Sequence, residues 1–400
     1  MSGTNIKLLP VEVARARMLA EVSPLPAETV FIADSIGRVL AEDVAAVRDQ
    51  PPYPASAMDG YAVRAGPAAR LKVIGESAAG GPFEGRVGSG EAVRVFTGGA
   101  IPVGCDAVVI QEDAERDGEF VAVPKVEPGR HVRPAGGDFR AGEILLKKGE
   151  VIDPWRLSLA AAAGRAELRV GGRPRVALFG TGEEIVEAPA VPGPYQIYDS
   201  GSRALAALVA AWGGVPARAR PVRDDMEATI AALRAADADL VVTVGGASVG
   251  DHDLVRGAAA ALGLELKVAS VNVRPGKPTF FGVLGDGRRL LGLPGNPASA
   301  LVCAELFLRP IVTAFQGAPA VPSAIPARLE TPLPANGERE HLMRAKLSFE
   351  GGEVRVRPYR DQDSSLVSVF ALSDALLRRD AGAPALEAGA VVEVLPLRRA

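Results

Sequence analysis

The segment DLVVTVGGASVGDHDLVRGAAAAL, residues 239–262, joins an apolar run to an alanine-rich helical pattern through a loop of small residues. The run at 240–244 has the length and valine content of a strand that is buried on both faces. The residues after the loop have the apolar spacing of a helix. A strand, a glycine-containing loop and a helix in this order are typical of a parallel sheet covered by helices.

The same rhythm extends over residues 174–316, where strand patterns such as RVALFG alternate with helical patterns such as SRALAALVAAWG. It predicts an α/β domain with a parallel sheet and helices on both faces. In such sheets ligands bind beyond the carboxyl ends of the strands. The candidate functional segments are therefore those that follow strands, at residues 180–184, 223–225, 245–253 and 292–299.

The chain on both sides of this domain has a different pattern. Short Val- and Ile-rich runs separated by Gly and Pro predict β structure at 61–138, and similar runs after Pro319 predict a small barrel. Helical periodicity at 10–22 and at 153–164, where Asp153 is a candidate N-cap, flanks the first β-rich stretch. The predicted fold is multidomain α/β plus β, with an elongated helical or mixed domain (1–45 and 139–173, discontinuous), an inserted β-rich domain (46–138), the α/β domain (174–318) and a C-terminal β-barrel (319–400).

Composition excludes several classes of protein. The chain has 400 residues, of which 48% are hydrophobic and 23% charged, with a formal net charge of −3. This is a globular composition without the basic excess of a nucleic-acid-binding protein, so no nucleic-acid partner is expected. The N-terminus lacks the apolar core of a signal peptide, and the alanine-rich runs are too short to span a bilayer. We expect a soluble, cytoplasmic protein with no membrane partner.

Cysteine and histidine are rare. Cys105 and Cys303 lie far apart in apolar segments, which favours buried thiols in a reducing compartment over a disulfide. The three histidines show no zinc or haem spacing, so neither site is expected.

Two loops of small residues are candidates for anion binding. VGGASVGDHD (244–253) and LLGLPGNPASA (290–300) each follow a strand and open a helix, where backbone N–H groups and the helix dipole favour an oxyanion. The first loop alone could simply make a tight turn, and it matches neither the P-loop, since no Gly-Lys-Ser/Thr follows, nor the dinucleotide fingerprint. Two such loops on one sheet edge predict a phosphate or oxyanion site, formed by Gly245, Gly246, Ser248, Gly250, Pro294, Gly295 and Asn296.

Charged residues gather at the same predicted edge. RPGKP (274–278) holds Arg274 and Lys277 on a proline-stiffened segment, which suits a phosphate or tetrahedral oxoanion, although a solvated turn would have the same sequence. Carboxylates follow successive strands, and hard oxygen ligands beside phosphates are how proteins usually hold Mg²⁺. Each acid alone could equally be a helix cap or a surface charge. The acids are Glu184, Asp224, Asp225, Asp251 and Asp253.

Taken together, these segments resemble the molybdopterin molybdenumtransferase family, to which the E domain of gephyrin is related. The matching segments run in the same order along almost the whole chain. They are PPYPASAMDGYAV (51–63), RVFTGGAIPVGCDAVV (94–109), VRPAGGDFRAGE (132–143), GTGEEIV (180–186), QIYDSGSRAL (196–205), VVTVGGASVGDHD (241–253), RPGKP and GLPGNPASA (292–300).

The resemblance implies four domains and a homodimer, with a cleft between the α/β domain of one subunit and the inserted domain of the other. It also implies that adenylylated molybdopterin arrives from a separate molybdopterin adenylyltransferase, a transient partner. With a divalent cation and molybdate, AMP is then released and molybdenum is left on the dithiolene.

The family's functional residues can be carried over position by position. The matching positions are, for catalysis, Asp59, Thr97, Asp138 and Lys277; for substrate binding, Arg133, Arg274, Ser365 and Ser368 with the loop residues above; and, for Mg²⁺, Glu184, Asp224 and Asp253. Two positions depart from the family pattern. Arg274 stands where a lysine is common, and Ser270 stands where a second lysine is common, with Lys267 nearby.

Two other functions would fit parts of the sequence. Because gephyrin's E domain also anchors receptors, a scaffold is an alternative to an enzyme; the charged residues at strand ends favour the enzyme. A general nucleotide phosphotransferase is a third interpretation, and it should bind ATP without molybdopterin. The sequence does not separate molybdate from tungstate, which have similar size and charge.

Overall fold

A computed structural model describes residues 8–218, 221–246, 254–319 and 321–397. The chain forms two compact units. Unit 1 comprises Met1–Glu28, Gly37–Ala41 and Val170–Ala400, and unit 2 comprises Thr29–Ile36 and Glu42–Arg169. Both the α/β domain and the barrel therefore belong to unit 1.

The centre of unit 1 is a six-stranded sheet with the strand order β16-β13-β17-β21-β20-β18. The strands are β13 (Arg175–Gly180), β16 (Val215–Arg218), β17 (Leu240–Val244), β18 (Glu265–Val268), β20 (Phe280–Val283) and β21 (Arg289–Leu293). Strand β17 is buried along its whole length, with Val242 in one hydrophobic core and Val241 in the other. Burial on both faces explains why this strand reads as a continuous apolar run.

The predicted parallel sheet is correct for four strands and wrong at one edge. Strands β16, β13, β17 and β21 are parallel neighbours, but β20 runs antiparallel to both β21 and β18. Only residues 284–288 join β20 to β21. A link of that length can close a hairpin but cannot make the crossover that a parallel pair requires.

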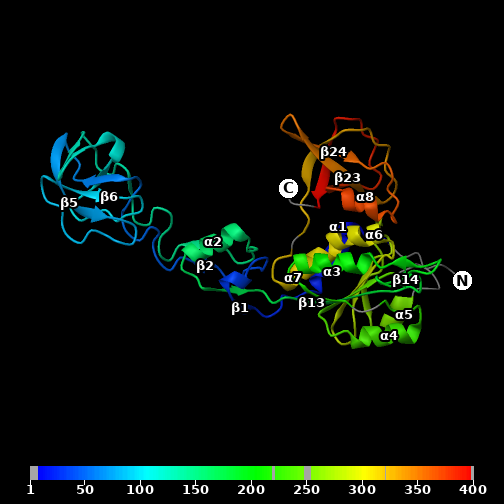
Figure 1. Ribbon diagram of the computed structural model, residues 1–400. Helices are drawn as coiled ribbons and strands as arrows, with labels where there is room; N and C mark the ends of the chain where they lie inside the picture. The colour runs from blue at the N-terminus through cyan, green and yellow to red at the C-terminus, as the bar shows by residue number, and fades with distance from the viewer. Residues whose placement is uncertain (1–7, 219–220, 247–253, 320, 398–400) are drawn as a thin grey trace. The chain divides into compact units, whose positions relative to one another are not determined.

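Helices cover both faces of the sheet (Figure 1). One face packs against α1, α3 and the segment α6–η3–α7, and the other face packs against α4 and α5. The helices are α1 (Val11–Ala20), α3 (Gly201–Ala211), α4 (Met226–Ala235), α5 (Leu254–Ala261), α6 (Pro297–Cys303), the π-helical η3 (Ala304–Leu308) and α7 (Arg309–Phe315). The α/β fold predicted for this region is confirmed.

Helix α1 has the apolar face that its spacing predicts, with Val11, Ala14 and Met18 buried. These side chains are part of the core that α1 shares with α7 and the sheet. The helix therefore belongs to unit 1, whereas the sequence analysis grouped it with residues 139–173. Periodicity identifies an apolar face but does not say which surface will cover it.

Among the described residues, one helix is long and apolar enough to cross a membrane. It is Pro297–Phe315, and 94% of its apolar window is buried inside the protein. Its residues from Ala298 to Leu308 supply much of the core beneath the barrel. It is a core helix of unit 1.

The C-terminal strands close into a barrel as predicted. Strands β22, β23, β24, β25 and β26 form a ring that the β23–β25 pairing closes, and β19 adds to β23 at one side. The sequence pattern did not predict the fifth barrel strand, β25, or the short helix α8. The elements are β19 (Val273–Arg274), β22 (Ile325–Leu329), β23 (Glu340–Glu350), β24 (Glu353–Pro358), α8 (Val367–Leu372), β25 (Ala375–Arg379) and β26 (Val391–Pro396).

Unit 2 is built around a second six-stranded sheet, in the order β7-β4-β6-β5-β9-β8. Its strands are β4 (Gly60–Val63), β5 (Ala69–Ser77), β6 (Glu91–Val95), β7 (Ala107–Ile110), β8 (Glu115–Asp117) and β9 (Phe120–Val123). Neighbouring residues of one strand, such as Tyr61 and Ala62, belong to separate cores on the two faces. This agrees with the β-rich character predicted for residues 61–138.

Unit 2 also contains short helices and two-stranded pairs, and one of these pairs lies where the chain passes from one unit to the other. Helix α2 begins at Pro154, and the Asp153 carboxylate accepts a 2.8 Å hydrogen bond from the Arg156 N–H, which confirms the predicted cap. The remaining elements are α2 (Pro154–Ala162), η1 (Ile32–Asp34), η2 (Gln111–Asp113), and the paired strands β1 (Glu28–Phe31) with β12 (Glu167–Val170), β2 (Val44–Ala45) with β11 (Ile144–Leu146), and β3 (Ala55–Ser56) with β10 (Val132–Arg133).

Candidate active site

A large hollow of about 1290 Å³ lies in unit 1 at the carboxyl edge of the parallel strands. Its wall includes the residues that directly follow β13, β17 and β21, as expected for an α/β sheet. Residues of the barrel close another side. We call this hollow the cleft.

The two predicted anion-binding loops meet in the cleft. Gly245 and Gly246 both have positive φ, 92° and 63°, which glycine adopts without strain. A Cβ placed on Gly295 would lie only 3.3 Å from the Gly245 Cα, so the two backbones approach closely. Pro294 and Asn296 also line the cleft. The structure thus joins five of the predicted loop residues into one amide-rich wall, while Ser248, Gly250, Asp251 and Asp253 lie outside the described residues.

The RPGKP segment places two cations on the cleft wall. Arg274 and Lys277 both line the cleft and are exposed. The turn between them packs on helix α6, because a Cβ on Gly276 would lie 2.3 Å from the Cys303 Sγ. Burial raises the pKa of the Cys303 thiol to about 12, so this cysteine is a packing residue and not a nucleophile.

A third cation comes from the barrel. Arg339, just before β23, lines the cleft and also a second hollow of about 600 Å³ that Arg274 and Lys277 share. The short strand β19 pairs with β23, with Arg274 opposite His341. Burial, together with the charges of Arg274 and three further arginines, lowers the pKa of His341 to about 4, so this side chain is neutral at physiological pH. The seam between the α/β domain and the barrel is therefore strongly cationic.

The loop before α8 forms the other barrel contribution. Asn296 Nδ2 donates a 2.6 Å hydrogen bond to the Ser364 hydroxyl, and the Ala298 N–H donates to the Ser364 carbonyl. Ser365 lines the cleft and donates from its hydroxyl and its N–H to Asp363, which lowers the pKa of that carboxyl. Ser368, on α8, is exposed and is not part of the cleft wall. Of the two predicted barrel serines, the structure places one at the cleft.

Two of the predicted metal ligands line the cleft together. Glu184 and Asp224 follow β13 and β16. The Glu184 carboxylate lies over Gly182, since a Cβ at that glycine would be 2.4 Å from Glu184 Oε2. Asp225 instead caps helix α4, accepting a 2.8 Å hydrogen bond from the Ala228 N–H. Adjacent acids therefore have different places in the fold.

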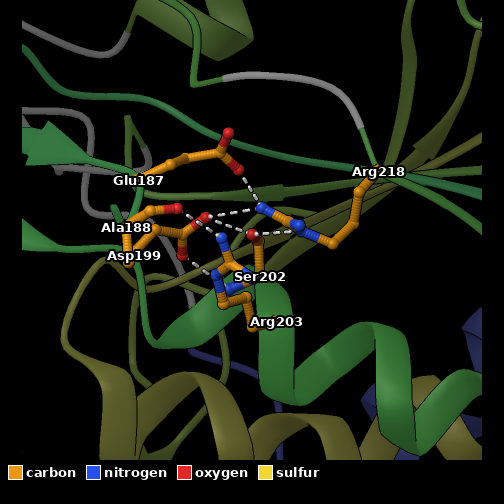
Figure 2. A network of polar contacts seen from close by, with 6 residues as sticks. All are labelled: Glu187, Ala188, Asp199, Ser202, Arg203 and Arg218. Carbon is orange, nitrogen blue, oxygen red and sulfur yellow. Dashed lines mark hydrogen bonds and ion pairs between the residues drawn. The ribbon is translucent and has the colours of Figure 1, made fainter. Parts of the chain in front are cut away.

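A polar network fixes the wall between Glu184 and helix α3 (Figure 2). Arg218 of β16 pairs with Glu187 and with the buried Asp199, and its Nε donates a 3.1 Å hydrogen bond to Ser202. Asp199 in turn accepts from the N–H and the hydroxyl of Ser202 at the start of α3. The short strands β14 (Ile185–Val186) and β15 (Ile197–Tyr198) run between these anchors, so the network holds this segment against the sheet edge.

At position 270, where the family commonly has a lysine, Lys267 does not supply the missing positive charge to the cleft. Ser270 is buried, at 2% exposure. Lys267 forms ion pairs with Glu21 and Glu265 and does not line the cleft. The cations that the described residues bring to the cleft are those of RPGKP and Arg339.

The remaining predicted residues lie in unit 2. Thr97 donates from both its N–H and its hydroxyl to the same Asp59 oxygen, each at 2.8 Å. These bonds, the backbone one first, lower the pKa of Asp59 and keep it ionised. Arg133 lies exposed on β10, which pairs with β3 close before Asp59, and the exposed Asp138 donates its N–H to the Gln50 carbonyl. We call Asp59, Thr97, Arg133 and Asp138 the unit 2 cluster.

Sequence reasoning missed several polar residues of the cleft wall, among them Arg339, Ser364 and Thr181. Arg339 and Ser364 stand in polar stretches of the barrel that carry no recognisable motif, and Thr181 lies inside a candidate segment but was not singled out. The neighbouring Ser365 was predicted from the family resemblance, which did not extend to Ser364.

The fold and the cleft define an α/β protein in which a C-terminal barrel contributes part of the wall of the candidate site. The matching family models are the MoeA N-terminal region (domain I and II) at residues 9–164, the probable molybdopterin binding domain at 177–314, and the MoeA C-terminal region (domain IV) at 326–397. The chain belongs to the molybdopterin molybdenumtransferase family.

Individual relatives match over most of the chain. A molybdopterin molybdenumtransferase of Staphylococcus aureus is 31% identical over 97% of this chain and 95% of its own length. One from Nostoc is 35% identical over 79% of this chain and 76% of its own length. Two structures of a molybdopterin biosynthesis MoeA protein from Pyrococcus horikoshii, 33% and 27% identical, cover 98% of this chain and all of theirs, with TM-scores of 0.81 and 0.83.

Proposed function

We propose that this chain transfers molybdenum from molybdate to the dithiolene of molybdopterin, which it receives as adenylylated molybdopterin, and that AMP is released. The observation that carries the proposal is the cleft, where an amide-rich wall at Gly245 and Gly295 and the cations of RPGKP line one hollow. Its substrates are a phosphorylated pterin and an oxyanion, and both need such donors.

Each kind of residue in the cleft has a different chemical role. The glycine loops supply N–H groups for phosphoryl oxygens without the bulk of side chains. Arg274, Lys277 and Arg339 supply positive charge for molybdate and for the charge that develops when the phosphoanhydride bond to AMP breaks. Buried Cys303 is a thiol, so the chemistry does not run through a cysteine nucleophile.

We propose Mg²⁺ as the divalent cation of the reaction. Glu184 and Asp224 offer hard oxygen ligands on one wall, and Mg²⁺ is commonly held by one or two carboxylates together with substrate phosphates. The described residues contain no group of three or more metal-binding side chains, and Asp253, the third predicted ligand, lies outside them. When bound, Mg²⁺ would neutralise charge on the phosphates.

The finer expectations from the family remain part of this proposal. They are a homodimer in which the unit 2 cluster of one subunit completes the cleft of the other, a molybdopterin adenylyltransferase as transient partner, and a cytoplasmic location. Asp59 is ionised and is held by Thr97 at the surface of unit 2, which supports a role in which it acts on a ligand bound by the other subunit.

The deciding experiment measures AMP release by the purified chain from adenylylated molybdopterin. We expect release in the presence of molybdate and Mg²⁺ and almost none when either is left out. AMP release that is independent of molybdate would contradict molybdenum transfer. ATP hydrolysis without molybdopterin would favour the phosphotransferase instead.

A further inference from the structure

Two buried threonines of the α/β domain stand out from the others. Thr181 is 7% exposed and Thr243 is fully buried, and neither hydroxyl has a hydrogen-bond partner among the residues that the structure describes. Buried hydroxyls are normally bonded, because an unbonded one keeps the cost of losing its water. In the same domain, the hydroxyls of Thr229, Thr279 and Thr313 each donate to a backbone carbonyl.

The two unbonded hydroxyls have different surroundings. Thr243 lies inside β17, two residues after the core residue Val241 and so on the same face of the sheet, and it is not part of the cleft wall. Thr181 follows β13 and lines the cleft. A Cβ on Gly245 or Gly246 would lie 3.0 or 2.9 Å from the Thr181 Oγ1, so the absence of both side chains leaves space beside this hydroxyl.

We infer that the Thr181 hydroxyl donates a hydrogen bond to a phosphoryl oxygen of the bound substrate at the Gly245–Gly246 loop. This rests on the proposed function, which supplies the phosphorylated substrate, and it assigns a binding residue to that site. A hydroxyl bonded to a charged oxygen makes a stronger hydrogen bond than one bonded to a neutral oxygen. Because Thr181 is already shielded from water and its backbone N–H is bonded to the Val244 carbonyl, binding does not have to dehydrate the hydroxyl or order this stretch of backbone.

The order of the strands separates this contact from the cations. Thr181 follows β13, whereas Lys277 precedes β20, and β17 and β21 lie between these strands. Three strand spacings amount to about 14 Å along the sheet edge. We therefore place Thr181 on the AMP phosphoryl group at the glycine loop, and Lys277 on the side of the anhydride that faces the pterin and the molybdate.

The test compares Thr181→Val with Thr243→Val, because each change removes one buried, unbonded hydroxyl and keeps the branched shape. AMP binding is measured by calorimetry on the full chain, molybdate binding is measured separately, and thermal unfolding is followed for each variant. We expect Thr181→Val to weaken AMP binding about tenfold, as for loss of a hydrogen bond to a charged group. Thr243→Val and Thr181→Ser should bind AMP as the wild type does, and both valine variants should keep or raise the melting temperature.

Several results would overturn the inference. They are unchanged AMP binding in Thr181→Val, an equal loss in Thr243→Val, and a loss of molybdate affinity with AMP affinity kept. If Thr181→Val does not fold, Thr181→Ala removes the same hydroxyl and is held to the same criteria. Unchanged AMP binding alongside normal molybdate-dependent AMP release would overturn this inference alone, whereas a wild-type chain that neither binds nor releases AMP would overturn the proposed function as well.

Discussion

The cleft of unit 1 and the unit 2 cluster both hold candidate functional residues but differ in construction. The cleft is a concave site to which four strand ends and a barrel contribute donors, cations and carboxylates. In the unit 2 cluster, by contrast, Asp59 is held ionised by two hydrogen bonds from the exposed Thr97, and the side chains of Arg133 and Asp138 are exposed. A cleft can bind a small ligand alone, whereas a single fixed charge on a surface acts only on something brought to it. Changes in the cleft should therefore alter ligand or metal binding, or the reaction itself, within one subunit, and changes in the cluster should alter turnover through another subunit.

The largest effect is expected from Lys277→Ala. If Lys277 meets charge that develops as the anhydride breaks, its loss should lower kcat by about 10²–10³ at saturating substrate. Lys277→Arg should recover part of the rate, because a planar fork replaces a compact charge. Steady-state AMP release checks this, with Lys267→Ala as a control, since Lys267 is paired away from the cleft. A raised KM with kcat intact would limit Lys277 to ground-state binding.

A smaller effect is expected from the acids, where the fold supplies a matched pair. Asp224→Ala should raise the Mg²⁺ concentration for half-maximal AMP release about tenfold, a change typical of a disturbed metal shell. Asp225→Ala should leave the Mg²⁺ titration unchanged and lower stability by about 1 kcal/mol, because Asp225 caps α4. Identical metal titrations for the two variants would remove Asp224 from the metal site.

Subunit exchange tests whether the two regions act in trans. Asp59→Ala and Lys277→Ala, each nearly inactive alone, should recover about one quarter of wild-type activity when mixed in equal amounts, because half the dimers are mixed and each mixed dimer holds one intact site. Mass measurement verifies that exchange has occurred. Verified exchange without recovered activity would mean that each cleft works with its own subunit's Asp59.

The smallest effect is on stability in acid. His341 is buried and neutral at the seam of unit 1, and burial with neighbouring arginines lowers its pKa from 6.5 to about 4. The unfolded chain then binds the proton first, so the folded state should lose stability as the pH falls from about 6.5 towards 4. Replacing His341 with Gln should reduce the fall in melting temperature over this pH range by a few degrees. The same slope in wild type and variant would show that other groups carry it.

The residues that sequence reasoning found in unit 1 share one physical cause. Glu184, Asp224 and the glycine loops follow strands, and the carboxyl ends of parallel strands meet at one edge whatever the rest of the chain does. The structure accordingly brings them together in the cleft. No such rule identifies the unit 2 cluster. An Asp–Gly pair such as Asp59–Gly60 also occurs in ordinary turns, so the residues of this cluster were predicted from family resemblance alone.

The features that could not be predicted from the sequence depend on packing between distant segments of the chain. Arg339 and Ser364 reach the cleft only because the barrel docks on the α/β domain through β19 and α6, contacts between segments distant in the chain. Strand β25 is buried almost throughout and so lacks the alternation that marks a half-exposed strand. Strand β20 was predicted as a strand, but its antiparallel direction was not, because an apolar run does not indicate the direction of a strand.

Strand β19 has a consequence for how the protein can be divided. It belongs in sequence to the α/β domain but pairs with β23 of the barrel, and Leu342 and Leu376 of the barrel share the core of the α/β helices. A fragment cut at the sequence boundary near residue 319 would expose both a strand edge and an apolar face, a combination that promotes aggregation. A chimera that carries the barrel of a relative should likewise fold only when the strand of that barrel equivalent to β23 pairs with β19. The α/β and barrel regions of unit 1 should therefore fold as one unit, although their sequence patterns indicate two domains.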